Sequence, residues 1–136
     1  MKDFGLTFHH MGLALKKEDE ALKFLAGMGY TAGEKRYDDK QKVFLRMCSA
    51  VGRPNVELVT EGPEKGPITA ILKRYSELVY HTCYETNDLQ KSLKAMDAAG
   101  LRVIETSPPT PAILFDGRLV SFYTVIGFGV IEILEA

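Results

Sequence analysis

The stretch Phe8-His9-His10-Met11-Gly12-Leu13-Ala14-Leu15 has the length and the apolar content of a β-strand. Residues 17–28 then change to helical spacing, with their apolar side chains on one face, and Gly29 is a typical helix stop. A shift of 71 residues carries His10 onto His81 and Gly29 onto Gly100, so the same strand and helix recur later in the chain. The sequence therefore predicts a chain built from two similar halves.

The strands that close the two halves match as well. Apolar runs predict strands over residues 42–48 and 55–60 in the first half, and over residues 118–125 and 128–135 in the second. A shift of 75 residues carries Val56-Glu57-Leu58 onto Ile131-Glu132-Ile133. A further short strand over residues 101–105 gives the second half the order βαβββ, and we expect the same α+β module in the first half. Each module has a histidine on its first strand and a glutamate on its last.

The length of 136 residues suits one domain, which we expect to span residues 1–136. We place a first module at about 5–61, a linker with a short helix at about 62–76, and a second module at about 77–136. The helix of the second module should begin after an Asp88 N-cap. We expect no regular structure over residues 107–111, because three prolines remove backbone donors and fix φ.

Strand alternation separates a core face from a second face in each half. The second face carries His10 beside small residues in the first half, and Glu57 points to the same side because its two neighbours are core residues. If the second faces of the two halves curl toward each other, four side chains converge. These are His10, Glu57, His81 and Glu132.

Two imidazoles and two carboxylates form a donor set that a borderline divalent metal ion prefers, and they leave positions open for water and substrate. A carboxylate flanked by Val, Leu and Ile on a sheet face is costly unless it is paired or coordinated. The sequence therefore predicts one divalent metal site. A mixed nitrogen and oxygen site tolerates several ions, so Ni, Co, Zn, Mg and Mn all stay open.

Other reactive residues are assigned structural roles. His9 meets Tyr80 under the 71-residue shift and lies on the apolar face of its strand, so we expect it to be structural. Cys48 and Cys83 lack zinc-ligand spacing and fit a reducing cytoplasm better than a disulfide framework. Cys83 shares a strand face with His81, yet we expect it to act as a small buried apolar residue. No P-loop, dinucleotide fingerprint or nucleophile elbow is present.

The composition excludes several classes of partner. With 17 Lys and Arg against 18 Asp and Glu, the net charge of −1 gives no general attraction to nucleic acid or to an anionic membrane. The longest apolar stretch, residues 119–134, is interrupted by polar residues and glycines and is too short to span a bilayer. Residues 1–15 carry no secretory signal pattern. We therefore expect a cytoplasmic protein with a small-molecule partner.

Four segments resemble the vicinal oxygen chelate superfamily, which includes glyoxalase I and methylmalonyl-CoA epimerase. They are residues 9–15, 56–59, 80–85 and 130–135. The resemblance implies the glyoxalase/bleomycin resistance protein/dioxygenase fold, in which two βαβββ modules form a cupped mixed sheet around one divalent ion. It also implies a homodimer, and its ligand positions fall on His10, Glu57, His81 and Glu132.

The resemblance further implies a lyase or isomerase of the glyoxalase I (lactoylglutathione lyase) or methylmalonyl-CoA epimerase type. Such an enzyme moves a proton on the carbon next to a carbonyl through a metal-stabilised enediolate or enolate, with Glu132 as the catalytic base. A thiol hemithioacetal and an acyl-CoA both stay open as substrates. Two alternatives are a metal-free binding or antibiotic-sequestering protein of the same fold, and an Fe(II) extradiol-type dioxygenase.

Overall fold

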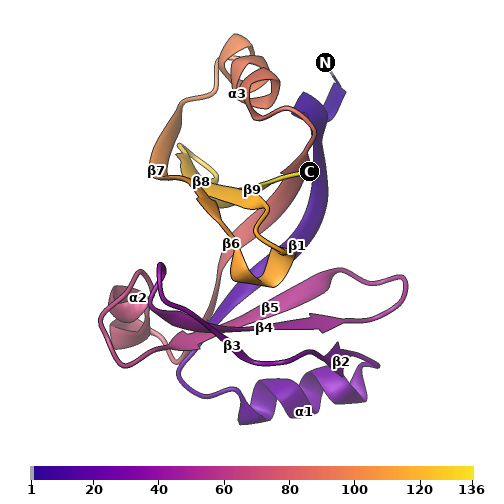
Figure 1. Cartoon of the computed structure of the whole chain (residues 1–136), viewed down its shortest axis with the longest axis vertical. Helices are drawn as coiled ribbons and strands as arrows, with labels where there is room; N and C mark the ends of the chain where they lie inside the picture. The colour runs from indigo at the N-terminus through magenta and orange to yellow at the C-terminus, as the bar shows by residue number, and fades with distance from the viewer. Residues whose placement is uncertain (1) are drawn as a thin grey trace. The chain divides into compact units, whose positions relative to one another are not determined.

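The computed structural model describes residues 2–136, whose strands and helices fall into two units (Figure 1). The first unit comprises residues 10–80. The second unit comprises residues 2–9 together with residues 81–136. No helix among residues 2–136 is long and apolar enough to cross a membrane.

The sheet of the first unit has the order β2-β4-β5-β1, and β3 also pairs with β4. β1 runs parallel to β5, whereas β4 runs antiparallel to it. The unit contains part of β1 (Leu6–Leu15), α1 (Asp19–Gly27), β2 (Thr31–Ala32), β3 (Arg36–Asp38), β4 (Val43–Ser49), β5 (Asn55–Glu61) and α2 (Thr69–Arg74).

Helix α1 covers one face of this sheet. Its buried Leu25 packs against Leu15, Val56 and Leu58, and Cys48 completes the cluster. Because side chains alternate along a strand, residues next to these core positions point to the opposite face. That opposite face carries Glu57, as the sequence predicted.

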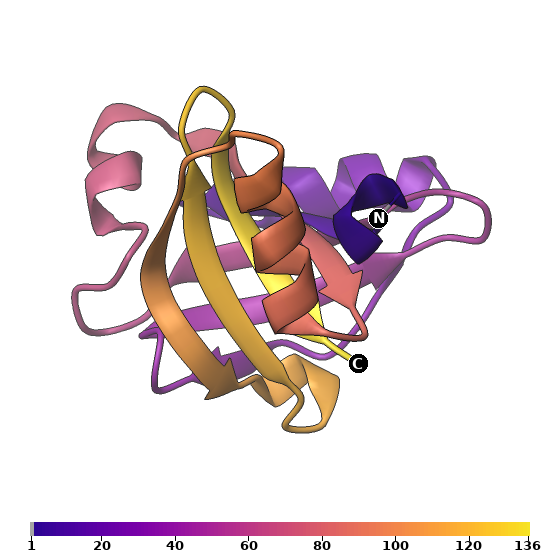
Figure 2. The same cartoon turned by 90° about the horizontal axis from the view of Figure 1, so that it is seen from above.

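The sheet of the second unit has the order β6-β9-β8-β7, with β6 and β9 parallel and the other pairs antiparallel. Helix α3 packs on one face of it (Figure 2). There Leu89 and Met96 share a buried cluster with Tyr123 and Ile131. The elements are η1 (Lys2–Gly5), the start of β1, most of β6 (Glu77–Thr86), α3 (Leu89–Ala98), β7 (Val103–Pro111), η2 (Ile113–Phe115), β8 (Leu119–Val125) and β9 (Gly129–Glu135).

The ends of the two long helices agree with the sequence signals. The Asp88 carboxylate accepts a hydrogen bond from the backbone N–H of Lys91, which confirms the predicted N-cap of α3. Gly29 and Gly100 follow α1 and α3 with φ of 87° and 83°, a left-handed backbone that glycine adopts without steric cost. The repeated strand and helix therefore end in the same way in both units.

One prediction about regular structure was wrong. β7 continues from Val103 through Pro111, across the segment expected to be irregular. β7 is the outer strand of its unit, and its register against β8 shifts between Glu105 and Ser107 and again between Ser107 and Thr110. Pro108 and Pro109 fall inside the second shift, where no ladder hydrogen bond is required of them.

Candidate metal centre

The first unit places His10 of β1 beside Glu57 of β5. The register pairs Gly12 with Glu57, so His10 lies two residues away on the same face. The His10 Nε2 and Glu57 Oε1 atoms are 3.7 Å apart, and the two residues are 0% and 4% exposed. The sequence prediction that these two side chains share the face opposite α1 is confirmed.

Small residues on β1 leave room for this pair. Gly12 lies directly opposite Glu57, and Ala14 is the next residue on the same face. On the other side of β5, Met47 of β4 pairs with Glu57. The carboxylate therefore projects from an inner strand of this sheet, between Gly12 and Met47, and an ionised group buried there is costly unless it is paired.

The second unit places His81 of β6 beside Glu132 of β9. Cys83 pairs with Glu132 in the register, so His81 again lies two residues away on the same face. The His81 Nε2 and Glu132 Oε1 atoms are 3.3 Å apart, and both residues are 3% exposed. This pair also lies opposite the helix of its unit, as the alternation of β9 predicted.

An aromatic ring orients the second histidine. The Phe122 ring of β8 meets the His81 ring edge-on, with their centroids 5.5 Å apart and their planes at 89°. Phe122 also pairs with Glu132 in the register of β8 and β9, so it lies next to both members of the His81–Glu132 pair. Sequence analysis did not single out Phe122, and the signal that could have found it was its alternation with Ser121 and Tyr123.

The structure thus brings together the predicted ligands two by two. His10 lies with Glu57 in the first unit, and His81 lies with Glu132 in the second. Each pair offers one imidazole and one carboxylate, which are ligand types for divalent metal ions. That both pairs hold one ion stays a prediction.

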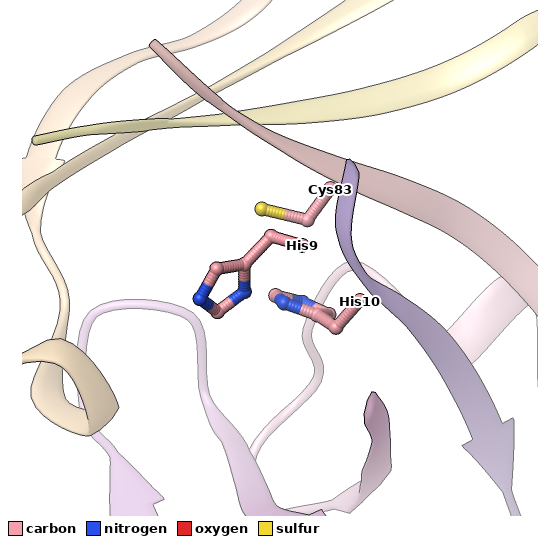
Figure 3. Close-up of side chains that lie close together, drawn as sticks. All are labelled: His9, His10 and Cys83. Carbon is pink, nitrogen blue, oxygen red and sulfur yellow. The ribbon is translucent and has the colours of Figure 1, made fainter. Parts of the chain in front are cut away.

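His9 and Cys83 lie together in the second unit, which sequence analysis did not predict (Figure 3). A ring nitrogen of His9 and the Cys83 sulfur are within 4.8 Å of each other. The His9 ring also meets Phe115 edge-on at 5.3 Å. Cys83 is fully buried in an apolar cluster with Val120 and Leu134, as expected for a structural cysteine. Burial likewise raises the pKa of the Cys48 thiol, which disfavours its reactive thiolate form.

A known family model matches most of this sequence. The model of the Glyoxalase/Bleomycin resistance protein/Dioxygenase superfamily matches residues 9–122 of this sequence. The chain belongs to this superfamily. Its match confirms the resemblance to vicinal oxygen chelate proteins and the α+β fold class that the sequence predicted.

Solved structures show the same fold at low sequence identity. Methylmalonyl-CoA epimerase from Mycobacterium tuberculosis has a TM-score of 0.79 and 16% identity, covering 99% of this chain and 91% of its own. A hypothetical protein from Bacillus halodurans has a TM-score of 0.78 and 19% identity, covering 96% and 94%.

A Streptomyces coelicolor methylmalonyl-CoA epimerase variant in complex with 2-nitronate-propionyl-CoA has a TM-score of 0.73 and 20% identity, covering 96% of this chain and 98% of its own. No curated protein matches the chain in sequence. At these identities the similar structures establish the fold of this superfamily member.

Proposed function

We propose that this chain is a divalent-metal-dependent lyase or isomerase that moves a proton on the carbon next to a carbonyl. In this proposal the two units act as one domain, and four residues hold a single ion. They are His10, Glu57, His81 and Glu132. The observation that carries the proposal is the burial of one His–Glu pair in each unit, on the face opposite its helix.

The donor atoms within each pair fit shared coordination. Two ligands about 2.1 Å from one ion at right angles to each other are about 3 Å apart. The paired nitrogen and oxygen atoms are 3.7 Å and 3.3 Å apart, so small side-chain movements suffice to bring each pair onto one ion. The combined charge of two carboxylates balances a divalent cation, which supports one ion per chain.

Glu132 is our candidate for the catalytic base. A bound divalent ion supplies Lewis-acid polarisation of a substrate carbonyl, which acidifies the neighbouring C–H. Glu132 would leave the ion, take that proton on its carboxylate and return it to the same or the adjacent carbon. Its neighbours Ile131 and Ile133 are both buried in the α3-side core, which fixes the backbone from which the carboxylate acts.

The other three residues would bind the metal ion and keep it in position. His10 and Glu57 contribute from the first unit, and His81 contributes from the second with its ring packed against Phe122. Buried surroundings exclude water, which strengthens electrostatic interactions with developing charge on the substrate. Since the similar epimerases act on acyl-CoA, we propose an acyl-CoA thioester as the first substrate class and a thiol hemithioacetal as the second.

A panel assay tests this function. Metal-stripped protein is supplied with Ni, Co, Zn, Mg or Mn, then assayed with methylmalonyl-CoA and with hemithioacetals of glutathione and other thiols in deuterated water. We expect metal-dependent deuterium incorporation at the carbon next to the carbonyl. Glu132→Gln should lower the rate by about 10²-fold or more, because a positioned base is lost. The control Glu135→Gln, at the end of the same strand, should leave the rate unchanged.

Three results would contradict the proposal. The first is an absence of exchange with every metal and substrate, and the second is full activity of Glu132→Gln. The third is tight ligand binding that survives chelation and the His10→Ala substitution, which would favour a metal-free binding protein. Metal-dependent oxygen uptake with catechols would instead identify a dioxygenase.

A further inference from the structure

A cavity of about 480 Å³ lies in the second unit, on the face of β6 and β9 that carries α3. Tyr84 and Ile131 line it, and their strand neighbours Cys83 and Glu132 point to the opposite face. None of the four candidate metal ligands contributes to the lining. The proposed function therefore does not use this cavity.

Aromatic and aliphatic side chains form the wall of the cavity. Four of its lining residues are Phe4, Phe8, Tyr84 and Phe128. The Phe8 and Tyr84 rings meet edge-on with centroids 5.8 Å apart. Phe8 is 45% exposed and Phe128 is 66% exposed, so both rings present apolar surface to solvent at the mouth. A bound apolar group would remove that surface from water.

The charge in the lining is negative. Asp3 lines the cavity, and no Lys or Arg among residues 2–136 does. The Asp3 side chain is exposed at the edge of the aromatic wall. Ring faces carry partial negative charge, so a carboxylate next to several rings attracts a cation and repels an anion.

The backbone that supplies Asp3 and Phe4 is strained. Asp3 has φ 56°, Phe4 has φ 53° and Gly5 has φ 70°, so three consecutive residues of η1 adopt the left-handed conformation. This conformation is disfavoured for residues with a Cβ, and such strain gathers at ligand-binding segments held by their surroundings. Here Phe4 packs against the core cluster beneath α3, and the turn aims Asp3 at the cavity.

We propose that this cavity binds a small organic cation, a quaternary or protonated amine with an apolar arm. Its charged head lies against Asp3 and the aromatic faces, and its arm packs against Met96 and Ile131. The volume accommodates a head group with a chain of several carbons. This binding is independent of the metal centre, because no candidate ligand lines the cavity and, on β6 and β9, the lining residues Tyr84 and Ile131 point to the face opposite that of His81 and Glu132.

Titration with hexyltrimethylammonium tests the site. Hexanol and hexanoate serve as neutral and anionic comparisons, and methyl NMR signals of Met96 and Ile131 report occupancy. We expect saturable shifts with the cation at a Kd about tenfold or more below that of hexanol, and no binding of hexanoate. Added chelator should leave the titration unchanged. Equal binding of all three probes, or shifts that depend on metal, would overturn the proposal.

Variants at the exposed mouth locate the binding. Phe128→Ala should raise the Kd of the cation about fivefold, and Asp3→Asn should raise it roughly two- to fivefold without changing the Kd of hexanol. The control Phe24→Ala removes an equally exposed ring, 68% exposed on α1 of the first unit, and should change nothing. Unchanged binding in Phe128→Ala would overturn the assignment. Self-association that depends on Phe128 would identify a second copy of the chain as the occupant, and would also overturn it.

Discussion

Arg46 of β4 donates three side-chain hydrogen bonds within the first unit. Its Nη2 donates to Glu18 Oε1 at 2.8 Å, its Nε donates to Glu18 Oε2 at 3.3 Å, and its Nη1 donates to the Gly33 carbonyl at 2.8 Å. The hydrogen bonds from Arg46 are the main cause that lowers the pKa of Glu18 below its ordinary value. One residue thus ties the start of α1 to the sheet that carries Glu57.

Replacing this residue tests its contribution to stability. Arg46→Gln should lower the free energy of unfolding by about 1–2 kcal/mol at neutral pH, because Glu18 is left partly buried without its guanidinium. Denaturant unfolding measures the change, and Lys23→Gln is the control because Lys23 pairs with Glu20 at the exposed surface.

The pH dependence has a defined sign. A lowered folded-state pKa means that the ionised carboxylate contributes stability above the ordinary pKa of 4.5, and that this contribution is lost as pH falls through the folded-state pKa. The difference between wild type and Arg46→Gln should therefore shrink in acid. A difference that stays constant down to about pH 2 would contradict the assigned role.

At the scale of elements, short strands secure the edge of the first sheet. β2 and β3 both pair with β4 on the side away from β5. The backbone N–H of Gly33, between β2 and β3, donates to the Met47 carbonyl at 2.7 Å. This close approach holds β4, whose Met47 lies opposite Glu57, and it leaves no space for a side chain at residue 33.

Two glycine substitutions test that close approach. A Cβ at Gly33 would lie 2.9 Å from the Met47 carbonyl oxygen, so Gly33→Ala should destabilise the fold by about 1–2 kcal/mol. A Cβ at Gly27, at the end of α1, meets nothing within 4 Å, so Gly27→Ala should stabilise by up to about 1 kcal/mol. Thermal unfolding compares the two, and equal effects would contradict the packing described for Gly33.

The sequence predicted the long elements better than the short ones. Periodic apolar residues and the Asp88 cap give α3 and its neighbours clear signals, whereas the two-residue and three-residue strands β2 and β3 are too short for any periodicity. The second half of β7 was missed because proline was treated as incompatible with a strand, although an outer strand with register shifts tolerates it.

For the whole molecule, the sequence repeat predicted both His–Glu pairs, because strand alternation fixes the face on which each side chain lies. The same rule could not predict the cavity beside η1. Its wall combines residues from several segments far apart in sequence. The left-handed backbone at Asp3 and Phe4 also could not be predicted, because neither residue is a glycine. Local patterns thus predict which residues share a face, but tertiary packing decides which cavities form.

Metal stoichiometry tests the central claim, that pairs from both units hold one divalent ion. Calorimetric titration of metal-stripped protein with Ni, Co, Zn or Mn should give one ion per chain with micromolar or tighter affinity. His10→Ala and His81→Ala should each abolish that binding, although the two residues belong to different units, and His9→Ala should leave it intact. Binding of two independent ions, or of none by the wild-type protein, would contradict the account.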